Sequence, residues 1–419
     1  MPANVSSTDR TAVIGAGVIG SMTAWALARE GHKVLLIDRS QPALSGASFG
    51  NAGHIASEQL QPLPSPSLLL TFWRELYPFG GLLHIPLRRW LPLAPWWLRF
   101  VRAAFQQQRN TPALASLVRP AVAVLDAQLA EIGRRELLCR RGHYSLWLGP
   151  RGAVRAARAL RDAEALGVRA EPAPEGLLRA LAARAGLGPA AGCWYADSAH
   201  VIDPRRLACA FVEAATAAGA VFENTEVREM FPLGNRIGIR TEARVCSVPA
   251  AVVCAGVESA PLLARFGLKA PLTAERGYHI EMPGEPPIAE APVLHADHSI
   301  AVTPMDGRLR ATSYLEFERH GAPADARKLE RLRTRVRALG YRCASTDGGW
   351  VGSRPTLPDY LPGLGRAPAQ AGLFYAVGHQ HLGLTLAAPT ARVIAALVAH
   401  RDPGIDVRAF DLRRFGAVR

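Results

Sequence analysis

The chain has very little lysine. Only Lys33, Lys269 and Lys328 occur among its 419 residues, so arginine supplies the other 46 of its 49 basic residues. These arginines are scattered along the chain, and the formal net charge of +14 therefore reflects a compositional bias more than a surface that follows phosphates. We expect no nucleic-acid partner. The 38 glycines have no three-residue period, which excludes collagen, and the hydrophobic share of 49% excludes a disordered chain.

Cysteine is also sparse, and long apolar runs are missing. The six cysteines form no C-x-x-C pair and no disulfide spacing, which is typical of a reducing compartment. Residues 1–10 lack the apolar segment of a signal peptide, and no stretch reaches the ~18 uninterrupted apolar residues of a membrane-spanning helix. We expect a cytoplasmic protein of two or three domains, soluble or peripheral at the inner face of the cell membrane.

The most informative segment lies near the amino terminus. A strand over residues 10–14 runs into Gly15-Ala16-Gly17-Val18-Ile19-Gly20, a helix follows over 21–30, and a second strand over 33–37 ends at Asp38. In a G-x-G-x-x-G turn the first glycine permits the tight turn, the second lets the backbone approach a pyrophosphate, and the third lets the helix pack on the strand. The carboxylate of Asp38 is placed to accept from ribose hydroxyls. The segment predicts a dinucleotide site.

Two further segments favour FAD over a nicotinamide. The loop over residues 45–54 is rich in small and hydroxyl side chains, which suit a backbone that approaches a long ligand and donates to it. Residues 373–377 form another buried strand, which runs into Gly378 and then an apolar helix over 384–400. The amino end of that helix can stabilise negative charge on a reduced flavin ring. A single nicotinamide needs no such second site.

With these motifs the chain resembles the FAD-dependent D-amino-acid dehydrogenases, within the wider superfamily of D-amino-acid, glycine and sarcosine oxidases. The resemblance spans almost the whole chain, and the Gly-His-x-His-Leu-Gly-Leu-Thr segment is similar to the branch that includes D-hydroxyproline dehydrogenases. The matching motifs are VIGAGVIG (13–20), SFGNAGHI (48–55), ERGYHIEM (275–282), GSRPTLPDYLPGLG (352–365) and FYAVGHQHLGLT (374–385).

The resemblance implies an α/β and α+β fold, with a Rossmann-like FAD-binding domain and a discontinuous antiparallel-sheet substrate domain. The FAD-binding pieces are 1–61, 200–272 and 346–419, and the substrate domain covers 273–345 together with part of the helical region 62–199. The residues agree with this division. Asp306-Gly307 is a strong hairpin signal, and Asp203 and Asp325 are placed to cap helices over 204–218 and 326–339.

The resemblance also assigns the residues that contact FAD. One of them is Val227, whose backbone position holds the adenine in family members. The expected cofactor residues are Gly15, Gly17, Val18, Ile19, Gly20, Asp38, Arg39, Ser45, Ser48, Asn51, Ala52, Gly53, Val227, Ala255, Gly256, Gly378, His379, His381, Leu382, Gly383, Leu384 and Thr385.

The expected catalytic residues are Arg354, Tyr278 and His54. Arg354 occupies the position where the superfamily places a bidentate arginine, the best clamp for an amino-acid carboxylate. Tyr278 is expected to close over the substrate, or to be a half-buried sheet tyrosine. His54 is expected to lie beside the flavin, or to be structural. His379 and His381 have no carboxylate or cysteine at useful spacing, so we expect no metal.

The implied reaction is dehydrogenation of a D-amino acid by hydride transfer from Cα to flavin N5, giving an imino acid. Electrons then pass to a quinone or another acceptor. The more specific expected substrate is D-proline or cis-4-hydroxy-D-proline. The preference for the D enantiomer comes only from the resemblance. The alternatives are a sarcosine- or glycine-oxidase-like amine oxidase that uses oxygen, and a non-catalytic nucleotide-binding protein.

Residues 62–105 are the least similar to the family. Aromatics stand beside an arginine in Trp96-Trp97-Leu98-Arg99-Phe100, a pattern that suits a membrane interface next to a quinone. The competing interpretation is a set of substrate-domain helices with buried tryptophans. Pro86, Pro92 and Pro95 favour this second interpretation, because prolines break a long amphipathic helix.

Overall fold

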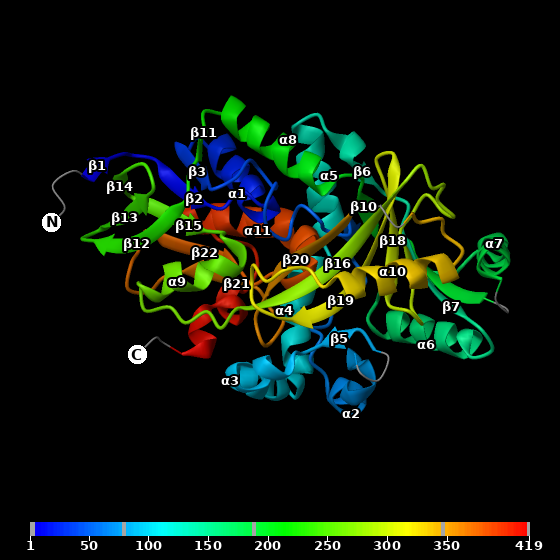
Figure 1. Ribbon diagram of the computed structural model, residues 1–419. Helices are drawn as coiled ribbons and strands as arrows, with labels where there is room; N and C mark the ends of the chain where they lie inside the picture. The colour runs from blue at the N-terminus through cyan, green and yellow to red at the C-terminus, as the bar shows by residue number, and fades with distance from the viewer. Residues whose placement is uncertain (1–4, 78–80, 187–189, 345–347, 417–419) are drawn as a thin grey trace.

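A computed structural model describes residues 5–77, 81–186, 190–344 and 348–416. Figure 1 shows two regions side by side: a layered α/β region, which holds β1 and the last long helix α11, and a region built around a long twisted sheet. The chain crosses between them several times, so neither region is continuous in sequence.

The α/β region is built on a six-stranded sheet. Its first five strands are parallel, and the four inner ones are nearly all apolar because they are buried on both faces. In spatial order the strands are β11 (Val221–Asn224), β3 (Val34–Asp38), β2 (Thr11–Ile14), β15 (Ala250–Val253), β22 (Leu373–Val377) and the antiparallel β21 (Gly363–Arg366).

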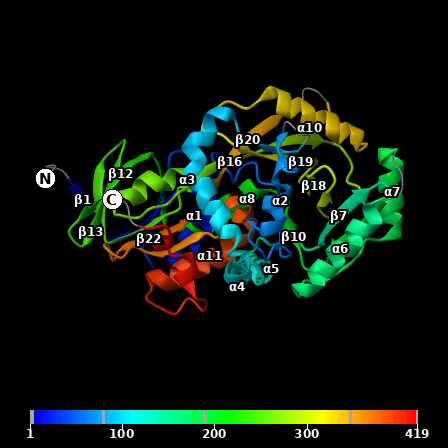
Figure 2. The same cartoon turned by 90° about the horizontal axis from the view of Figure 1, so that it is seen from below.

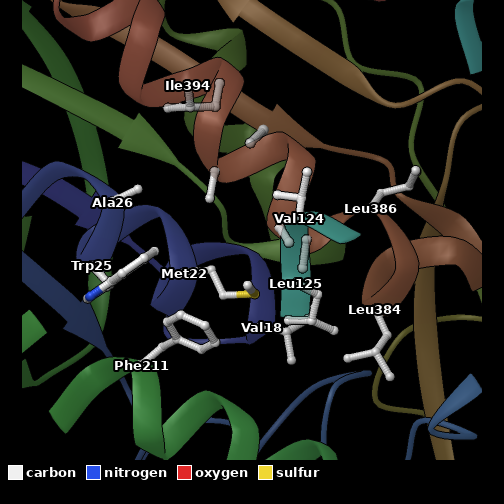
Figure 3. Close-up of a cluster of buried hydrophobic side chains, with 14 of the residues drawn as sticks. Val18, Met22, Trp25, Ala26, Val124, Leu125, Phe211, Leu384, Leu386 and Ile394 are labelled. Carbon is white, nitrogen blue, oxygen red and sulfur yellow. The ribbon is translucent and has the colours of Figure 1, made fainter. Parts of the chain in front are cut away.

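Three long helices cover one face of this sheet: α1 (Val18–Arg29), α8 (Pro204–Ala217) and α11 (Gly383–Val398). Trp25 of α1 meets Phe211 of α8 edge to face, with ring centroids 5.2 Å apart (Figure 3). Helix α1 is apolar nearly all round because it is packed between α8, α11 and the sheet. The side chain of Asp203 caps α8, as expected.

The other face of the six-stranded sheet carries a four-stranded sheet and the short helix α9 (Ser259–Ala264). Ile37, Ile239 and Leu263 share the apolar cluster between these layers. The strands of the second sheet are β1 (Val5–Ser7), β14 (Val245–Val248), β13 (Arg236–Thr241) and β12 (Val227–Leu233). Residues 221–233 are therefore divided between two sheets, with β11 in the first and β12 in the second.

The second region is a nine-stranded, mostly antiparallel sheet. At its centre β16 (Thr273–Pro283) pairs with β19 (Arg308–Phe317) on one side and β20 (Gly349–Thr356) on the other. The other strands are β18 (Ile300–Met305), β17 (Val293–His295), β7 (His143–Leu148), β9 (Ala190–Tyr195), β8 (Ala170–Pro172) and β5 (Leu83–His84). Helices α6 (Gly152–Ala165), α7 (Glu175–Ala185) and α10 (Ala326–Ala338) pack against it.

Strand β20 departs from the expected domain division. Residues 346–419 were assigned to the FAD-binding domain, yet β20 pairs with β16 from residue 349 to residue 356. The return to the α/β region therefore comes after Thr356. Because Arg354 lies on β20, it reaches the site from the substrate-domain sheet.

A small sheet and four helices join the two regions. The sheet is formed by β4 (His54–Ile55), β10 (Ala199–Val201) and β6 (Leu138–Cys139). The helices are α2 (Pro66–Glu75), α3 (Leu87–Ala104), α4 (Gln107–Val118) and α5 (Ala121–Glu131). Helices α2 and α3 lie together at the bottom of Figure 1 and face the viewer in Figure 2.

Helix α3 corrects the expectation that prolines break this segment. It runs through Pro92 and Pro95, which both lie on its exposed side, so water can reach the carbonyl groups that lose their helical partners. Trp96 is buried, as the substrate-domain interpretation expected, whereas Trp73 and Trp90 are exposed.

Two helical stretches are long and apolar enough to span a membrane by length and composition, Gln107–Glu131 and Gln380–Val398. Most of each stretch is buried inside the molecule. Both α4 and α5 pack against α11, so their apolar surfaces serve the core.

Candidate functional site

A cavity of about 1460 Å³ extends from the glycine-rich turn after β2 to the inner face of the nine-stranded sheet. Ligand pockets usually measure roughly 300–1,000 Å³, so this cavity has room for a large cofactor and a second molecule. Its walls come from segments far apart in the sequence, including α1, β20 and the start of α11.

The glycine turn has the close contacts that a dinucleotide fingerprint requires. Gly15 has φ of 104°, and a Cβ on it would lie 2.5 Å from the carbonyl oxygen of Cys254. A Cβ on Gly20 would lie 1.8 Å from the carbonyl oxygen of Gly15. Helix α1 begins after Gly17, whose side chain cannot cap it; the N–H of Val18 donates to Ser48 Oγ at 3.1 Å, and the amino end of the helix faces the cavity, where its dipole favours an anion. These features fit a bound pyrophosphate.

Asp38 ends β3 at the cavity wall, where a ribose is expected. Its Oδ2 accepts from the backbone N–H of Ala16 at 2.6 Å, and its Oδ1 accepts from the N–H of Ser40 at 2.9 Å. The hydroxyl of Ser40 also donates to Oδ1, at 3.0 Å, so Oδ2 is the oxygen with a further lone pair for a ribose hydroxyl. Arg39, next to it, forms an ion pair with Glu258 at 2.7 Å across the same end of the cavity.

The structure brings the predicted cofactor residues together. Of those named above, all line the cavity except Gly20 and Gly53. Gly20 lets α1 pack on the preceding turn, and Gly53 has φ of 75° in the turn before β4. These two glycines position the site through the backbone instead of facing a ligand.

The turn at Gly378, directly after β22, carries two neutral imidazoles. His379 Nε2 lies 3.1 Å from Thr390 Oγ1, and His381 Nε2 lies 2.8 Å from Gln59 Oε1. Burial lowers the pKa of His379 to about 3 and that of His381 to about 4, so both rings are uncharged at pH 7. The following residues begin α11, whose amino end therefore points its dipole into the cavity wall.

Arg354 projects into the cavity wall from β20. Its Nη1 donates to Glu275 Oε1 and to the carbonyl oxygen of Tyr314, each at 3.3 Å. Glu275 is fully buried and also accepts from Tyr360 Oη at 2.7 Å. Both bonds of Arg354 use Nη1, which leaves its other N–H groups for a ligand. A Cβ on Gly277 would lie 2.2 Å from Arg354 Nη2, so only glycine leaves room for the guanidinium there.

Tyr278 does not face the substrate space, which corrects the sequence prediction. It is fully buried, and its hydroxyl donates to Glu316 Oε2 at 2.7 Å. The Oη of Tyr278 also accepts from the backbone N–H of Asp325. Tyr314 lines the cavity instead. Its buried hydroxyl has no hydrogen-bond partner among the described residues, and burial raises its pKa to about 12, so it keeps its proton.

Backbone strain is concentrated at this cavity. Six described non-glycine residues have positive φ, and four of them line the cavity: Ser299, Tyr314, Tyr360 and Gln380. Tyr314, with φ of 70°, sits inside β19, where such a conformation is unusual. Strain of this kind persists only where surrounding contacts hold it, and it gathers at functional sites.

His54 lies in the cavity wall together with a residue that sequence reasoning missed. Its Nε2 and the Nδ1 of His143 each lie 3.7 Å from the same oxygen of Glu58, Oε1. Burial lowers the pKa of both imidazoles, that of His143 to about 3. No local signal marks His143, because it is 89 positions away in sequence and only the fold brings it to His54.

Comparison with known proteins decides the family. The model of the FAD dependent oxidoreductase (DAO) family matches residues 10–397. The chain belongs to this family. It is 30% identical over 432 residues to a D-amino-acid oxidase of Bradyrhizobium diazoefficiens, covering 96% of this chain and 98% of that protein. It is 31% identical over 433 residues to a D-amino acid dehydrogenase of Cereibacter sphaeroides, with coverage of 97% and 96%.

The fold of this FAD dependent oxidoreductase also has solved counterparts. The glycine oxidase of Geobacillus kaustophilus superposes with a TM-score of 0.75 at 23% identity, over 97% of this chain and 99% of that chain. The expected fold class, the FAD cofactor and the resemblance to the D-amino-acid dehydrogenases are thereby confirmed.

In this FAD dependent oxidoreductase the cavity has a second, apolar arm that the sequence did not indicate. It is lined by Leu68 and Phe72 of α2, Trp97 and Phe100 of α3, and Phe317 of β19. Apart from the indole N–H of Trp97, these side chains carry no polar group. The arm therefore suits a flat or lipophilic molecule in place of an amino acid.

Proposed function

We propose that the enzyme oxidises a D-amino acid at Cα, with FAD as the hydride acceptor. The observation that carries the proposal is the guanidinium of Arg354 in the cavity wall, oriented by the buried Glu275. The names of full-length relatives, a D-amino-acid oxidase and several D-amino acid dehydrogenases, support the substrate class.

When bound, FAD accepts the hydride that leaves Cα, so the protein's own work is to position the amino acid. Arg354 binds the substrate carboxylate through its planar fork, which fixes one of the substituents that must be oriented around Cα. The carbonyl oxygen of Tyr314 accepts from Arg354 Nη1 and helps to hold the guanidinium in place. No general base is needed if the amine binds deprotonated.

The sharper form of the proposal names a cyclic substrate, D-proline or cis-4-hydroxy-D-proline. Its support is the Gly378-to-Thr385 segment and its similarity to the hydroxyproline branch. Oxidation of an open-chain amino acid gives an imine that hydrolyses to a 2-oxo acid and ammonia, whereas a cyclic product stays a pyrroline.

Turnover of matched enantiomers with an artificial electron acceptor tests this. We expect activity with D enantiomers only, fastest with the cyclic ones, and ammonia release only from open-chain substrates. Activity confined to L enantiomers, or to N-methylglycine and glycine, would contradict the proposal and favour the amine-oxidase alternative.

We further propose that the electrons pass to a quinone. The apolar arm of the cavity supports this, because its aromatic lining by Phe72, Trp97 and Phe317 suits a quinone ring. The reduced enzyme is expected to be reoxidised much faster by a short-chain ubiquinone analogue than by air. Rapid peroxide formation in air would instead identify an oxidase.

The outer surface above this arm supports contact with the inner face of the cell membrane. Helix α3 has a buried apolar face, with Leu93, Trp96 and Phe100, and an exposed apolar face opposite it. The exposed side chains Leu87, Leu91, Leu98 and Phe105 recur at helical spacing, each at least 72% exposed. A helix that is apolar on two faces and is not buried suits a lipid interface.

Exposed arginines border the same surface, at Arg74, Arg88 and Arg102. They complement the anionic headgroups of a cytoplasmic leaflet. We therefore expect co-sedimentation with vesicles that contain phosphatidylglycerol. The double variant Leu91→Glu, Leu98→Glu should lose it while keeping flavin, whereas Val154→Glu on α6, which is equally exposed, should not. Equal sedimentation of all three proteins would contradict membrane contact.

A further inference from the structure

Three side chains from separate elements converge at the wall of the cavity without the hydrogen bonds that buried polar atoms need. His54 comes from β4, Glu58 from the turn after it, and His143 from β7. His54 Nε2 and His143 Nδ1 are buried and have no hydrogen-bond partner among the described residues. Leaving such atoms unpaired costs about 1–3 kcal/mol each, so something is expected to join them.

The geometry of the three atoms has room for a metal ion at bonding distance from each. Glu58 Oε1 lies 3.7 Å from each imidazole nitrogen, and the three atoms all lie within 4.8 Å of one another. A point equidistant from all three is therefore roughly 2.0–2.4 Å from each, close to the 2.0–2.2 Å of zinc bound to imidazole and carboxylate.

The charge at the cluster also favours a bound cation. In the part of the chain that the structure describes, Glu58 forms no ion pair with an arginine or lysine; its neighbours are the two imidazoles and Ser198. A buried carboxylate without a cationic partner is costly, and a divalent cation would compensate it. Two imidazoles and one carboxylate form a donor set suited to zinc and related transition metals.

The outer partners of the three side chains are also those of a metal site. His143 Nε2 lies 3.2 Å from Ser145 Oγ, which fixes the ring with Nδ1 toward the cluster. Ser198 donates to Glu58 Oε2 at 2.6 Å, which leaves Oε1 for the ion. Hydrogen bonds of this kind orient metal ligands in proteins.

We propose that His54, Glu58 and His143 bind a divalent transition-metal ion of the zinc class. Because both histidines line the cavity, the ion lies in its wall, and a water or an oxygen atom of a bound molecule completes the coordination. The proposal departs from the expectation of no metal. That expectation rested on spacing near His379, and His143 lies too far from His54 in sequence for spacing to indicate the cluster.

The test is a calorimetric titration of chelator-treated, flavin-loaded enzyme with Zn²⁺, with metal content measured after dialysis. We expect one ion per chain, and at least about a 100-fold weaker affinity in Glu58→Gln and His143→Asn. Flavin content and melting temperature show whether each variant folds. His295→Asn is the matched control, because His295 is also buried but bonds Tyr341 outside the cluster.

Co²⁺ provides a second readout, since its absorption bands at long wavelength report the donor atoms directly. No bound metal in the wild-type enzyme, or the same affinity in all folded variants, would overturn the proposal. Neither readout needs amino-acid turnover, so this result is independent of the proposed oxidation.

Discussion

The residues that hold Arg354 show how one side chain is made into a receptor. Glu275 is fully buried and accepts from Tyr360, so it cannot turn away from the guanidinium. Gly277 leaves the space that the guanidinium occupies. Arg354 is thus oriented before any ligand arrives, which reduces the entropy that binding must overcome.

We expect Arg354→Lys to keep its flavin and to lose about 10- to 100-fold in kcat/KM, mostly through a higher KM. Lysine keeps the charge but cannot form two parallel hydrogen bonds to a carboxylate. Steady-state kinetics over a range of D-amino-acid concentrations measures this. Arg366→Lys, at the exposed end of β21, is the control. A variant with unchanged kinetics would show that Arg354 does not clamp the substrate.

Substitution of Tyr314 and of Tyr278 by phenylalanine should have different effects on stability. Tyr314→Phe removes a buried hydroxyl without a partner and keeps the carbonyl oxygen that Arg354 uses, so we expect stability to stay the same or rise with little change in KM for the amino acid. Tyr278→Phe removes the bond to Glu316, so we expect about 1–3 kcal/mol lower stability with little change in KM. Chemical unfolding and kinetics on both variants decide, and a reversed pattern would restore Tyr278 to the site.

At the scale of elements, the position of α1 determines whether FAD binds. Gly20→Ala would place a Cβ 1.8 Å from the carbonyl oxygen of Gly15, a contact with rigid backbone. We expect α1 to move away from β2 and the purified protein to lose its flavin. The absorbance ratio of flavin to protein measures this. Gly176→Ala on α7, where a Cβ meets nothing within 4 Å, should keep full flavin.

The local elements were predictable because their signals are local. The glycine turn, the N-cap Asp203 and the hairpin at Asp306-Gly307 each depend on residues within a few positions of one another. Helix α3 was not predictable in this way. The destabilisation that a proline causes in a helix depends on whether water reaches the carbonyl groups that it leaves unpaired, and therefore on whether its side of the helix is exposed. The choice between Tyr278 and Tyr314 depended on tertiary contacts, which no strand pattern contains.

The site as a whole shows the same limit. The cofactor residues were predictable through family motifs, which preserve positions that the fold brings together. Glu58 and His143 lie in no such motif, and nothing in the sequence pairs them. Likewise, the apolar arm exists only because α2 and α3 pack over β19.

At the scale of the whole molecule, stability should depend on pH through a buried charge network. Burial alone would raise the pKa of Glu316, but hydrogen bonds from His84, Lys328 and Tyr278 lower it to about 2. A pKa lowered by folding stabilises the protein fully above the unfolded value of 4.5. We therefore expect the melting temperature to fall as the pH drops from 4.5 toward 2.

Removing that carboxylate should show its role at neutral pH. Glu316→Gln leaves the ammonium of Lys328, which is fully buried, without its carboxylate, so we expect a loss of about 3–5 kcal/mol in unfolding free energy. The exposed Glu330→Gln on α10 should change it by less than about 1 kcal/mol. Equal effects of the two variants would contradict the network.

The most direct test of the central claim is to mix the purified enzyme anaerobically with D-proline and with L-proline and follow the flavin absorbance. We predict rapid bleaching by the D enantiomer and slow or absent bleaching by the L enantiomer. In Arg354→Lys, a higher concentration of D-proline should be needed to reach the same bleaching rate. Bound flavin that no amino acid of either hand reduces would contradict the proposed function and leave only the family assignment.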